Sequence, residues 1–267
     1  MFNGLAFFNF ILRFIPGNWF MEKPFRITFP TGAIATAVQV QTPATLWQAL
    51  KELGLPKRQR VLVIIGGASK LSDEDFNRVQ LLFLEVLAPL ATQWGACVVD
   101  GGTDAGVMRL MGQARSTLNA SFPLIGVTPV GLAVLPGQSA TSPDAASLES
   151  NHTHFLLIPG SNWGDESPWI ADVASVLADD QPSVAVLING GEVSWKDASQ
   201  NVQEGRSVIT MAGSGRTADV LAAVLRGQAT DQRAQEIIQS GLVKAIDLTA
   251  GREELTKTIE MIFAGKE

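Results

Sequence analysis

The chain has 267 residues, a formal net charge of −6 and 46% hydrophobic residues, which suits one large α/β domain with a sizeable core. An acidic chain without a basic stripe excludes nucleic acid as a partner. The single cysteine, Cys97, excludes a disulfide framework, and with only His152 and His154 beside it we expect no metal site and no cofactor. This cysteine usage favours a reducing compartment, so the expected location is cytoplasmic.

The N-terminal residues 5–20 are the most apolar stretch of the chain, but Arg13 interrupts them and Pro16 with Gly17 ends them. Such a run is too short to span a bilayer, and it lacks the charge order and cleavage site of a secretory signal. We therefore expect no transmembrane segment. The favoured interpretation is packing against the domain or a second subunit, which leaves a homo-oligomer open; contact with a membrane surface is the less favoured alternative.

The chain divides into three predicted parts. Residues 1–60 form an extension with short strands at 25–29 and 36–41 and a helix from Thr45 to Leu53. Residues 61–227 form the main domain, and residues 228–267 add a helix, a strand and a helix that complete it. In the main domain, Ser72 followed by Asp75 predicts the start of a long amphipathic helix that Pro89 should bend.

Six apolar runs in the main domain each end in a loop with glycine or proline. Helical patterns at 168–177 and 216–225, among others, lie between most of them. The run from Val61 to Ile65 is continuous and rich in β-branched residues, as in strands buried on both faces. The six runs occupy residues 61–65, 97–99, 123–129, 153–158, 183–188 and 206–212. The pattern predicts a Rossmann-like, doubly wound α/β fold with a mostly parallel sheet and helices on both faces.

The strand exits of such a sheet converge on one edge, where ligands bind. The stretch DGGTDAGVM places Gly101, Gly102, Thr103 and Gly106 between a strand and a helix, where unpaired N–H groups and the helix dipole favour a phosphate. Further glycine pairs follow two other strands and are candidate ligand loops at the same edge: Gly66 with Gly67, and Gly190 with Gly191.

The stretch AGSGR is a second candidate phosphate loop. Gly213 and Gly215 free the backbone, and Ser214 is placed to cap the helix that follows. Arg216 stands at a helix start, where the dipole disfavours a cation, and a bound phosphate would explain its presence. The alternative is an ion pair of Arg216 with Asp219 or Asp172.

Other titratable residues offer weaker candidates. In GGEVSWKDA, Asp197 is a candidate general base or ribose ligand, although acids near a helix start are commonly solvated. Glu192 of the same stretch is the other such acid. His152 and His154 share one face of a strand, which is compatible with acid–base work or a metal, but with no carboxylate at ligand spacing nearby the favoured interpretation is a structural role at the strand entry. Asp165 and Glu166 receive no catalytic role, because acids at a helix start are favoured by the dipole alone.

The blocks DGGTDAGVMRLMGQA, LIGVTPVG, LESNHTHFLLIPG, VLINGG and MAGSGRTADVLA resemble the N-terminal cytosolic domain of the melastatin-type (TRPM) ion channels, in its free-standing prokaryotic form (LSDAT). The resemblance covers about residues 61–227 and implies membership of the SLOG superfamily, whose Rossmann-like domains bind nucleotides and nucleotide-derived signals such as ADP-ribose. It also implies that Arg216 contacts ligand phosphate. Where the channel domains offer further basic contacts this chain has Pro168, Trp169 and Ile170, which weighs against ADP-ribose itself.

The DGGTDAGVM block is also similar to the GGG-x-x-GLM element of the Lonely Guy phosphoribohydrolases, which cleave nucleoside 5′-monophosphates. Their second element, PGG-x-GT-x-x-E, aligns with NGGEVSWKD. In this alignment Asn189 replaces the proline, Val193 replaces the third glycine, and Asp197 stands at the place of the catalytic glutamate.

Three functions follow from these patterns. The first is a binding or sensor domain for a nucleotide-derived small molecule, whose phosphate contacts the loops of Gly101 and Gly213 together with Arg216. The second is N-glycosidic hydrolysis of nucleotides by Asp197. The third is an assembly module with a vestigial site.

Overall fold

The computed structural model describes residues 23–67 and 72–266. Its elements are β1 (Phe25–Thr28), β2 (Ile34–Gln39), the 3₁₀ turn η1 (Pro43–Thr45), α1 (Leu46–Glu52), β3 (Val61–Gly66), α2 (Asp73–Leu82), the π-helical turn η2 (Phe83–Leu87), α3 (Ala88–Gln93), β4 (Cys97–Asp100), α4 (Gly106–Thr117), β5 (Leu124–Pro129), β6 (Ala133–Val134), β7 (Ala146–Ser147), β8 (His154–Ile158), α5 (Ser167–Ala178), β9 (Ser183–Ile188), α6 (Glu192–Gln203), β10 (Ser207–Ala212), α7 (Arg216–Leu225), α8 (Gln232–Ile238), β11 (Val243–Asp247) and α9 (Arg252–Phe263).

One nine-stranded sheet runs through the molecule in the order β1-β2-β8-β5-β4-β3-β9-β10-β11. All neighbouring strands are parallel except β1, which pairs antiparallel with β2. The six predicted runs of the main domain are β3, β4, β5, β8, β9 and β10. The predicted α/β fold with a mostly parallel sheet is therefore confirmed.

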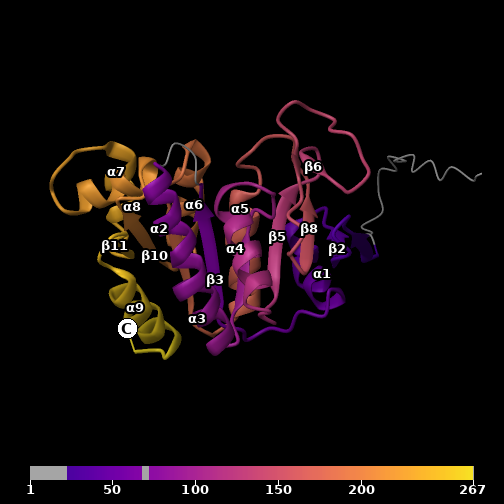
Figure 1. Ribbon diagram of the computed structural model, residues 1–267, viewed down its shortest axis with the longest axis horizontal. Coiled ribbons are helices and arrows are strands. Elements are labelled where there is room, and N and C mark those ends of the chain that lie inside the picture. The colour runs from indigo at the N-terminus through magenta and orange to yellow at the C-terminus, as the bar shows by residue number, and fades with distance from the viewer. Residues whose placement is uncertain (1–22, 68–71, 267) are drawn as a thin grey trace, which may run out of the picture.

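Both faces of the sheet are buried, and alternate residues of β3 show why. Val61, Val63 and Ile65 join a hydrophobic cluster with α1, α5, α6, α7 and α8. Leu62 and Ile64 point the other way, into a cluster with α2, η2, α3, α4 and α9. Side chains alternate along a strand, so a continuous apolar run supplies both clusters at once. Figure 1 shows the result: α2 and α4 lie in front of the sheet, and α5 and α6 lie behind it.

The helix that follows β3 begins as predicted. The Ser72 hydroxyl accepts a hydrogen bond from the N–H of Asp75 and caps α2. Near Pro89 the helix does not break, because the turn η2 widens to a π-helix before α3 begins. Proline lacks the N–H that the regular ladder would require, and the wider turn accommodates it.

The sheet has a topological switch point between β3 and β9, which are direct neighbours. From β3 the chain passes through α2 on one face toward β4, and from β9 it passes through α6 on the other face toward β10. The connections separate at this point, so the carboxyl ends of β3 and β9 border a natural crevice for a ligand. The long connection that contains β6 rises from this upper edge in Figure 1.

The two flanking parts of the chain join the same sheet. From the N-terminal part β2 pairs with β8, and from the C-terminal part β11 pairs with β10. The prediction that residues 1–20 pack against protein lies outside the described residues. No helix within residues 23–67 and 72–266 is both long and apolar enough to cross a bilayer.

Candidate functional site

A cavity of about 330 Å³ lies at the switch point, at the carboxyl edge of the sheet. Gly66 at the end of β3 and Gly101 after β4 form its floor. Its walls come from the start of α4, from α5, from α6 and from the long connection before β8. The residues of these walls are Thr103, Ala105, Met108, Asp144, Ala146, Trp163, Glu166, Ile170, Val193, Ser194 and Asp197. The structure thus brings Asp197 and the DGG loop, which lie far apart in sequence, to one cavity.

The DGG loop is held from behind by a buried charged cluster. Asp100 Oδ1 accepts from the N–H of Gly102 at 2.7 Å and lies 2.8 Å from His152 Nε2. His152 Nδ1 in turn lies 2.8 Å from Glu149 Oε2. Burial alone would lower the pKa of His152, but the carboxylates of Asp100 and Glu149 raise it to about 9. The histidine is therefore charged at neutral pH and fixes the loop between two carboxylates.

Two glycines of the predicted ligand loops are required by close backbone contacts. Gly66 has φ +126°, and a Cβ there would lie 1.9 Å from the Ile188 carbonyl oxygen on the neighbouring strand. Gly102 has φ +71°, and its Cβ would lie 2.7 Å from Gly126 Cα. Both positions exclude a side chain for reasons of packing. Gly101, by contrast, borders the cavity, where a Cβ would meet only the Met108 side chain at 3.9 Å.

Two carboxyl groups face the cavity from α5 and α6. Asp197 is 7% exposed, and its Oδ1 is buried without a hydrogen-bond partner among the described residues. Burial raises the pKa of its carboxyl to about 7, and the nearby Glu166 charge adds to the rise. Burial likewise raises the pKa of Glu166, whose Oε2 accepts from the N–H of Gly164 at 2.8 Å. Asp197 can therefore hold a proton near neutral pH.

The second glycine loop lies behind the first turn of α6 and outside the cavity wall. Asn189 N–H donates to Ser214 Oγ at 2.7 Å, and Thr217 Oγ1 donates to the Gly191 carbonyl at 3.0 Å. Ser214 therefore does not cap α7, contrary to the prediction, because its hydroxyl accepts the hydrogen bond from the Asn189 N–H just after β9. The N–H of Gly213 donates to Asp219 Oδ1 at 2.6 Å. This loop supports the Gly190–Gly191 turn from which α6 begins.

The remaining predicted residues lie at helix starts or at the strand end. Gly106 begins α4 with φ +49°, and Gly67 follows β3, where its N–H donates to the Ile188 carbonyl at 3.0 Å. Arg216 begins α7 with φ +56°, and its guanidinium lies beside Gly191: a Cβ on that glycine would be 3.2 Å from Arg216 Nη2. Arg216 thus flanks the start of α6 without lining the cavity.

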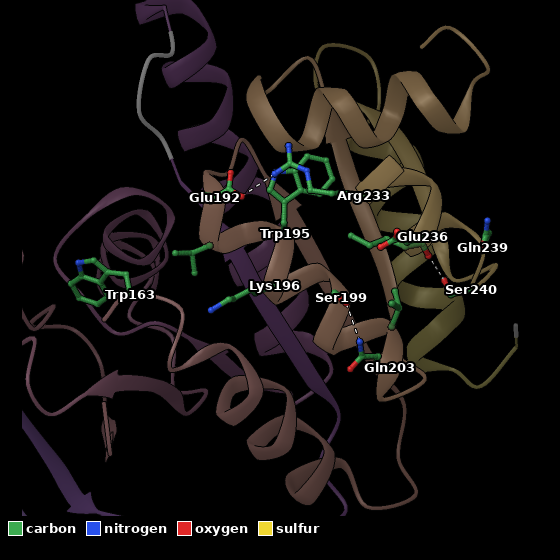
Figure 2. A pocket seen from close by; sticks show the side chains of 13 residues that line it. Trp163, Glu192, Trp195, Lys196, Ser199, Gln203, Arg233, Glu236, Gln239 and Ser240 are labelled. Carbon is green, nitrogen blue, oxygen red and sulfur yellow. Dashed lines mark hydrogen bonds and ion pairs between the residues drawn. The ribbon is translucent and has the colours of Figure 1, made fainter. Parts of the chain in front are cut away.

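A second, larger hollow of about 790 Å³ lies along the outer side of α6, toward α8. Arg233 of α8 stacks over the Trp195 ring at 4.5 Å and pairs with Glu192 at 2.9 Å. Figure 2 shows Lys196 pointing from α6 toward the side on which Trp163 lies, away from Arg233. We call this hollow the α6 groove. Trp163 and Val193 line both the groove and the cavity.

Sequence reasoning missed three features of this site. Its statement that no carboxylate stands near His152 was wrong: Glu149 lies only three residues before the histidine, whereas Asp100 lies 52 residues away and only the topology brings it there. It interpreted Glu166 as a helix-start acid and did not consider Trp163, and no local pattern marks either as a cavity residue.

Within the described ranges, no group of three or more His, Cys, Asp or Glu side chains is arranged to hold a metal ion.

The sequence of this chain is similar to regions of three ion-channel proteins. A region of the mouse "Transient receptor potential cation channel subfamily M member 2" is 24% identical over 227 residues, which cover 70% of this chain and 15% of the channel. The rat protein of the same name is 24% identical over 209 residues, covering 64% and 14% respectively. The "Transient receptor potential cation channel subfamily M member-like 2" of Nematostella vectensis is 22% identical over 252 residues, covering 80% and 16%.

The chain thus spans about 15% of the length of these channels. The family model described as "SLOG in TRPM, prokaryote" matches residues 59–257, a range that contains every residue of the cavity wall. The chain therefore belongs to the prokaryotic family of SLOG domains related to the TRPM channels.

Proposed function

We propose that this protein is a cytoplasmic binding domain for a nucleotide-derived small molecule that carries phosphate. The observation that carries the proposal is the cavity at the β3–β9 switch point, between the DGG loop and the first turn of α6. Doubly wound sheets bind their ligands at this position, and the volume lies at the lower end of the range for ligand pockets.

The chemistry of the wall suits a nucleoside. Met108, Ile170 and Val193 offer apolar surface to a base, and the carboxyls of Asp197 and Glu166 offer acceptors to ribose hydroxyls. A cavity with two carboxyls is a poor place for the phosphate itself. The phosphate is better placed at its edge, where the N-terminus of α6 and the Arg216 guanidinium flank Gly191.

Gly101→Val tests this placement. A side chain at Gly101 has room in the fold and would occupy the cavity, so the melting temperature should change little while ligand affinity falls at least tenfold. Binding is measured by calorimetric titration with nucleosides, nucleoside monophosphates and nucleoside diphosphates of the four common bases. Equal affinity in Gly101→Val and the wild type would place the ligand elsewhere, and a lack of binding by the wild type would favour the assembly module.

A second candidate function is N-glycosidic hydrolysis of nucleotides, which the burial of Asp197 inside the cavity favours. A carboxyl with a pKa of about 7 can transfer protons at neutral pH. Val193, however, adds a side chain where the related motif has glycine, and Asp197 is one methylene shorter than glutamate. We therefore expect turnover of AMP far below roughly 1 s⁻¹. Faster release of adenine that disappears in Asp197→Asn would establish the hydrolase instead.

A further inference from the structure

The cavity and the α6 groove share a boundary. Trp163 and Val193 line both hollows, so the cavity and the groove adjoin at these two side chains. Trp163 is half-buried, and its Nε1–H donates to the Asp144 carbonyl at 3.1 Å. This bond ties the loop after β8 to the long connection over the cavity and holds the indole ring at the boundary.

One cation stands at this boundary on the groove side. Lys196 is exposed, and a Cβ on Gly164, the neighbour of Trp163, would lie 3.3 Å from its Nζ. Asp165 and Glu166 lie close by, yet among the described residues no carboxylate comes within 4.0 Å of the Lys196 ammonium. Asp165 Oδ2 instead accepts from the N–H groups of Ser161 and Asn162, each at 3.0 Å. The Lys196 ammonium thus lies at the edge of the groove without an ion pair among these residues, although its charge opposes the rise in the pKa of Glu166 and of Asp197.

The other cation of the groove is engaged. Arg233 pairs with Glu192 and stacks over Trp195, and Lys196 points away from it (Figure 2). Lys196 is therefore the cation of the groove that is best placed to receive an anionic group leaving the cavity. It lies five residues beyond Gly191, which is about 7.5 Å along the helix axis, so one further phosphate can extend from the edge at Gly191 toward it.

We infer that the cavity and the α6 groove form one site with two compartments, and that the ligand is a nucleoside diphosphate or a longer derivative of one. The first phosphate lies at the Gly191 edge, and the second passes Val193 and Trp163 and binds Lys196. This inference rests on the proposed function, because it takes the nucleoside to lie in the cavity. It adds Lys196 and Trp163 as the residues that distinguish a diphosphate from a monophosphate.

The test is a titration of nucleoside, monophosphate and diphosphate of the four common bases into wild type, Lys196→Gln and Lys51→Gln. Lys51 is also an exposed helical lysine, and it lies on α1, so its variant is the matched control. We expect the wild type to bind the diphosphate about five- to tenfold more tightly than the monophosphate at low salt, with a smaller difference at high salt. Lys196→Gln should abolish this difference, and its loss of affinity for the diphosphate should exceed any change in affinity for the nucleoside, because the Lys196 charge also acts on Glu166 and Asp197.

Tryptophan fluorescence gives a second readout. Diphosphate binding should change the emission of the wild type more than monophosphate binding does, and Trp163→Phe should remove that excess. Equal affinity for both nucleotides, or an equal loss for nucleoside and diphosphate in Lys196→Gln, would overturn the inference while monophosphate binding still supports the proposed function. If no compound of the series binds the wild type, the proposed function and this inference both fail.

Discussion

Arg216 combines two unusual features in one residue. Its φ of +56° lies in the left-handed region, which disfavours residues with a Cβ, and its charge is at a helix start, where the dipole disfavours a cation. Strained backbone of this kind persists where the surroundings over-determine it, and functional sites are common among such places. The position of its guanidinium beside Gly191 supports a role at the edge of the cavity.

Arg216→Ala should lower the affinity for a phosphate-bearing ligand about 10- to 150-fold, since a charge-assisted contact contributes roughly 1.5 to 3 kcal/mol. Arg216→Lys should recover only part of this loss, because an ammonium lacks the planar fork of a guanidinium. Calorimetric titration measures both, with Arg226→Ala at the other end of α7 as the control. Unchanged affinity would make Arg216 structural, and a large fall in melting temperature without ligand would support an ion pair with Asp219 or Asp172.

Asp197 should make the folded protein less stable as the pH rises. Its carboxyl keeps its proton up to a pH of about 7 in the folded state but releases it near pH 3.8 when unfolded, so the free energy of unfolding falls across this window. Asp197→Asn removes the fall and should raise the free energy of unfolding at pH 8 by a few kcal/mol at most, with no gain near pH 3.5. Denaturant titrations at both pH values measure this effect.

The exposed acid variant Asp73→Asn is the control for Asp197→Asn, because Asp73 lies in the first turn of α2 and away from the cavity wall. It should show no comparable difference between the two pH values. A destabilised Asp197→Asn at pH 8 would mean that the ionised carboxylate stabilises the fold, and that Asp197 serves structure before ligand binding.

The connection between β4 and α4 depends on the charge of His152. The pKa of His152 is raised to about 9 in the folded state against 6.5 for an unperturbed histidine, so its contribution to stability is complete below pH 6.5 and is lost as the pH rises through 9. His152→Gln should lower the free energy of unfolding at pH 7 by a few kcal/mol, because it leaves Asp100 and Glu149 buried without a cation between them.

Denaturant titrations from pH 6 to pH 10 measure this prediction. The wild type should lose stability above pH 7, and His152→Gln should show a flatter profile. His154→Gln is the matched control, since His154 is half-buried and its Nδ1 lies 2.8 Å from the Thr153 hydroxyl. Parallel profiles for the wild type and His152→Gln would show that the charge of His152 does not hold the DGG loop.

At the level of helices and strands, much of the fold could be predicted from local sequence. The run from Val61 to Ile65 is apolar at every position and rich in β-branched residues, which is typical of a strand buried on both faces. The Ser72 cap was likewise visible, because serine followed three residues later by an acid is a local signal. The π-helical turn before Pro89 could not be predicted from sequence. The missing N–H of proline can be accommodated either by a bend in the helix or by a widened turn, and the sequence does not distinguish the two.

The candidate site was less predictable, because its residues meet only through the sheet topology. The glycine loops and Asp197 carry local motifs, and the cavity places Gly101 and Asp197 together. Glu166 and Trp163 join them only because the loop after β8 folds over β3, and nothing near them in sequence indicates this. Arg216 was expected at the same edge as the other glycine loops, but it does not line the cavity. Hydrogen bonds between Asn189 and Ser214 place its loop behind α6.

Across the whole molecule, the sheet extends beyond the range that the family model matches. Residues 59–257 match the family, but β1 and β2 lie before this range: β2 pairs with β8 on the flank of the sheet, and β1 pairs with β2. Ile27 and Phe29 pack with Phe155 of β8 in a buried cluster. Val38 and Leu46 join the main cluster on one face of the sheet, so the described residues before position 59 pack into the hydrophobic core of the family-matched range.

Removal of residues 1–58 should consequently unfold or aggregate the protein. The truncation would leave β8 as an edge strand with unpaired backbone groups and would expose Phe155 and Leu156, which are buried in the whole molecule. It would also remove α1, whose Leu46 and Leu50 pack in the same cluster as α5. Each large apolar side chain contributes about 1.5 to 3 kcal/mol when buried, so the loss of several approaches a typical total stability of 5 to 15 kcal/mol.

The comparison is between a protein of residues 23–267 and one of residues 59–267, which differ by β1, β2 and α1. Size-exclusion chromatography and circular dichroism should show a folded species with a cooperative melting transition for the longer protein alone. Phe155→Ala in the longer protein is the intermediate case: it keeps the strand pairing, removes one aromatic side chain, and should lower stability by about 3 to 5 kcal/mol. A shorter protein that melts cooperatively at the same temperature would show that the family-matched range folds on its own and that β1 and β2 are an addition to a complete core.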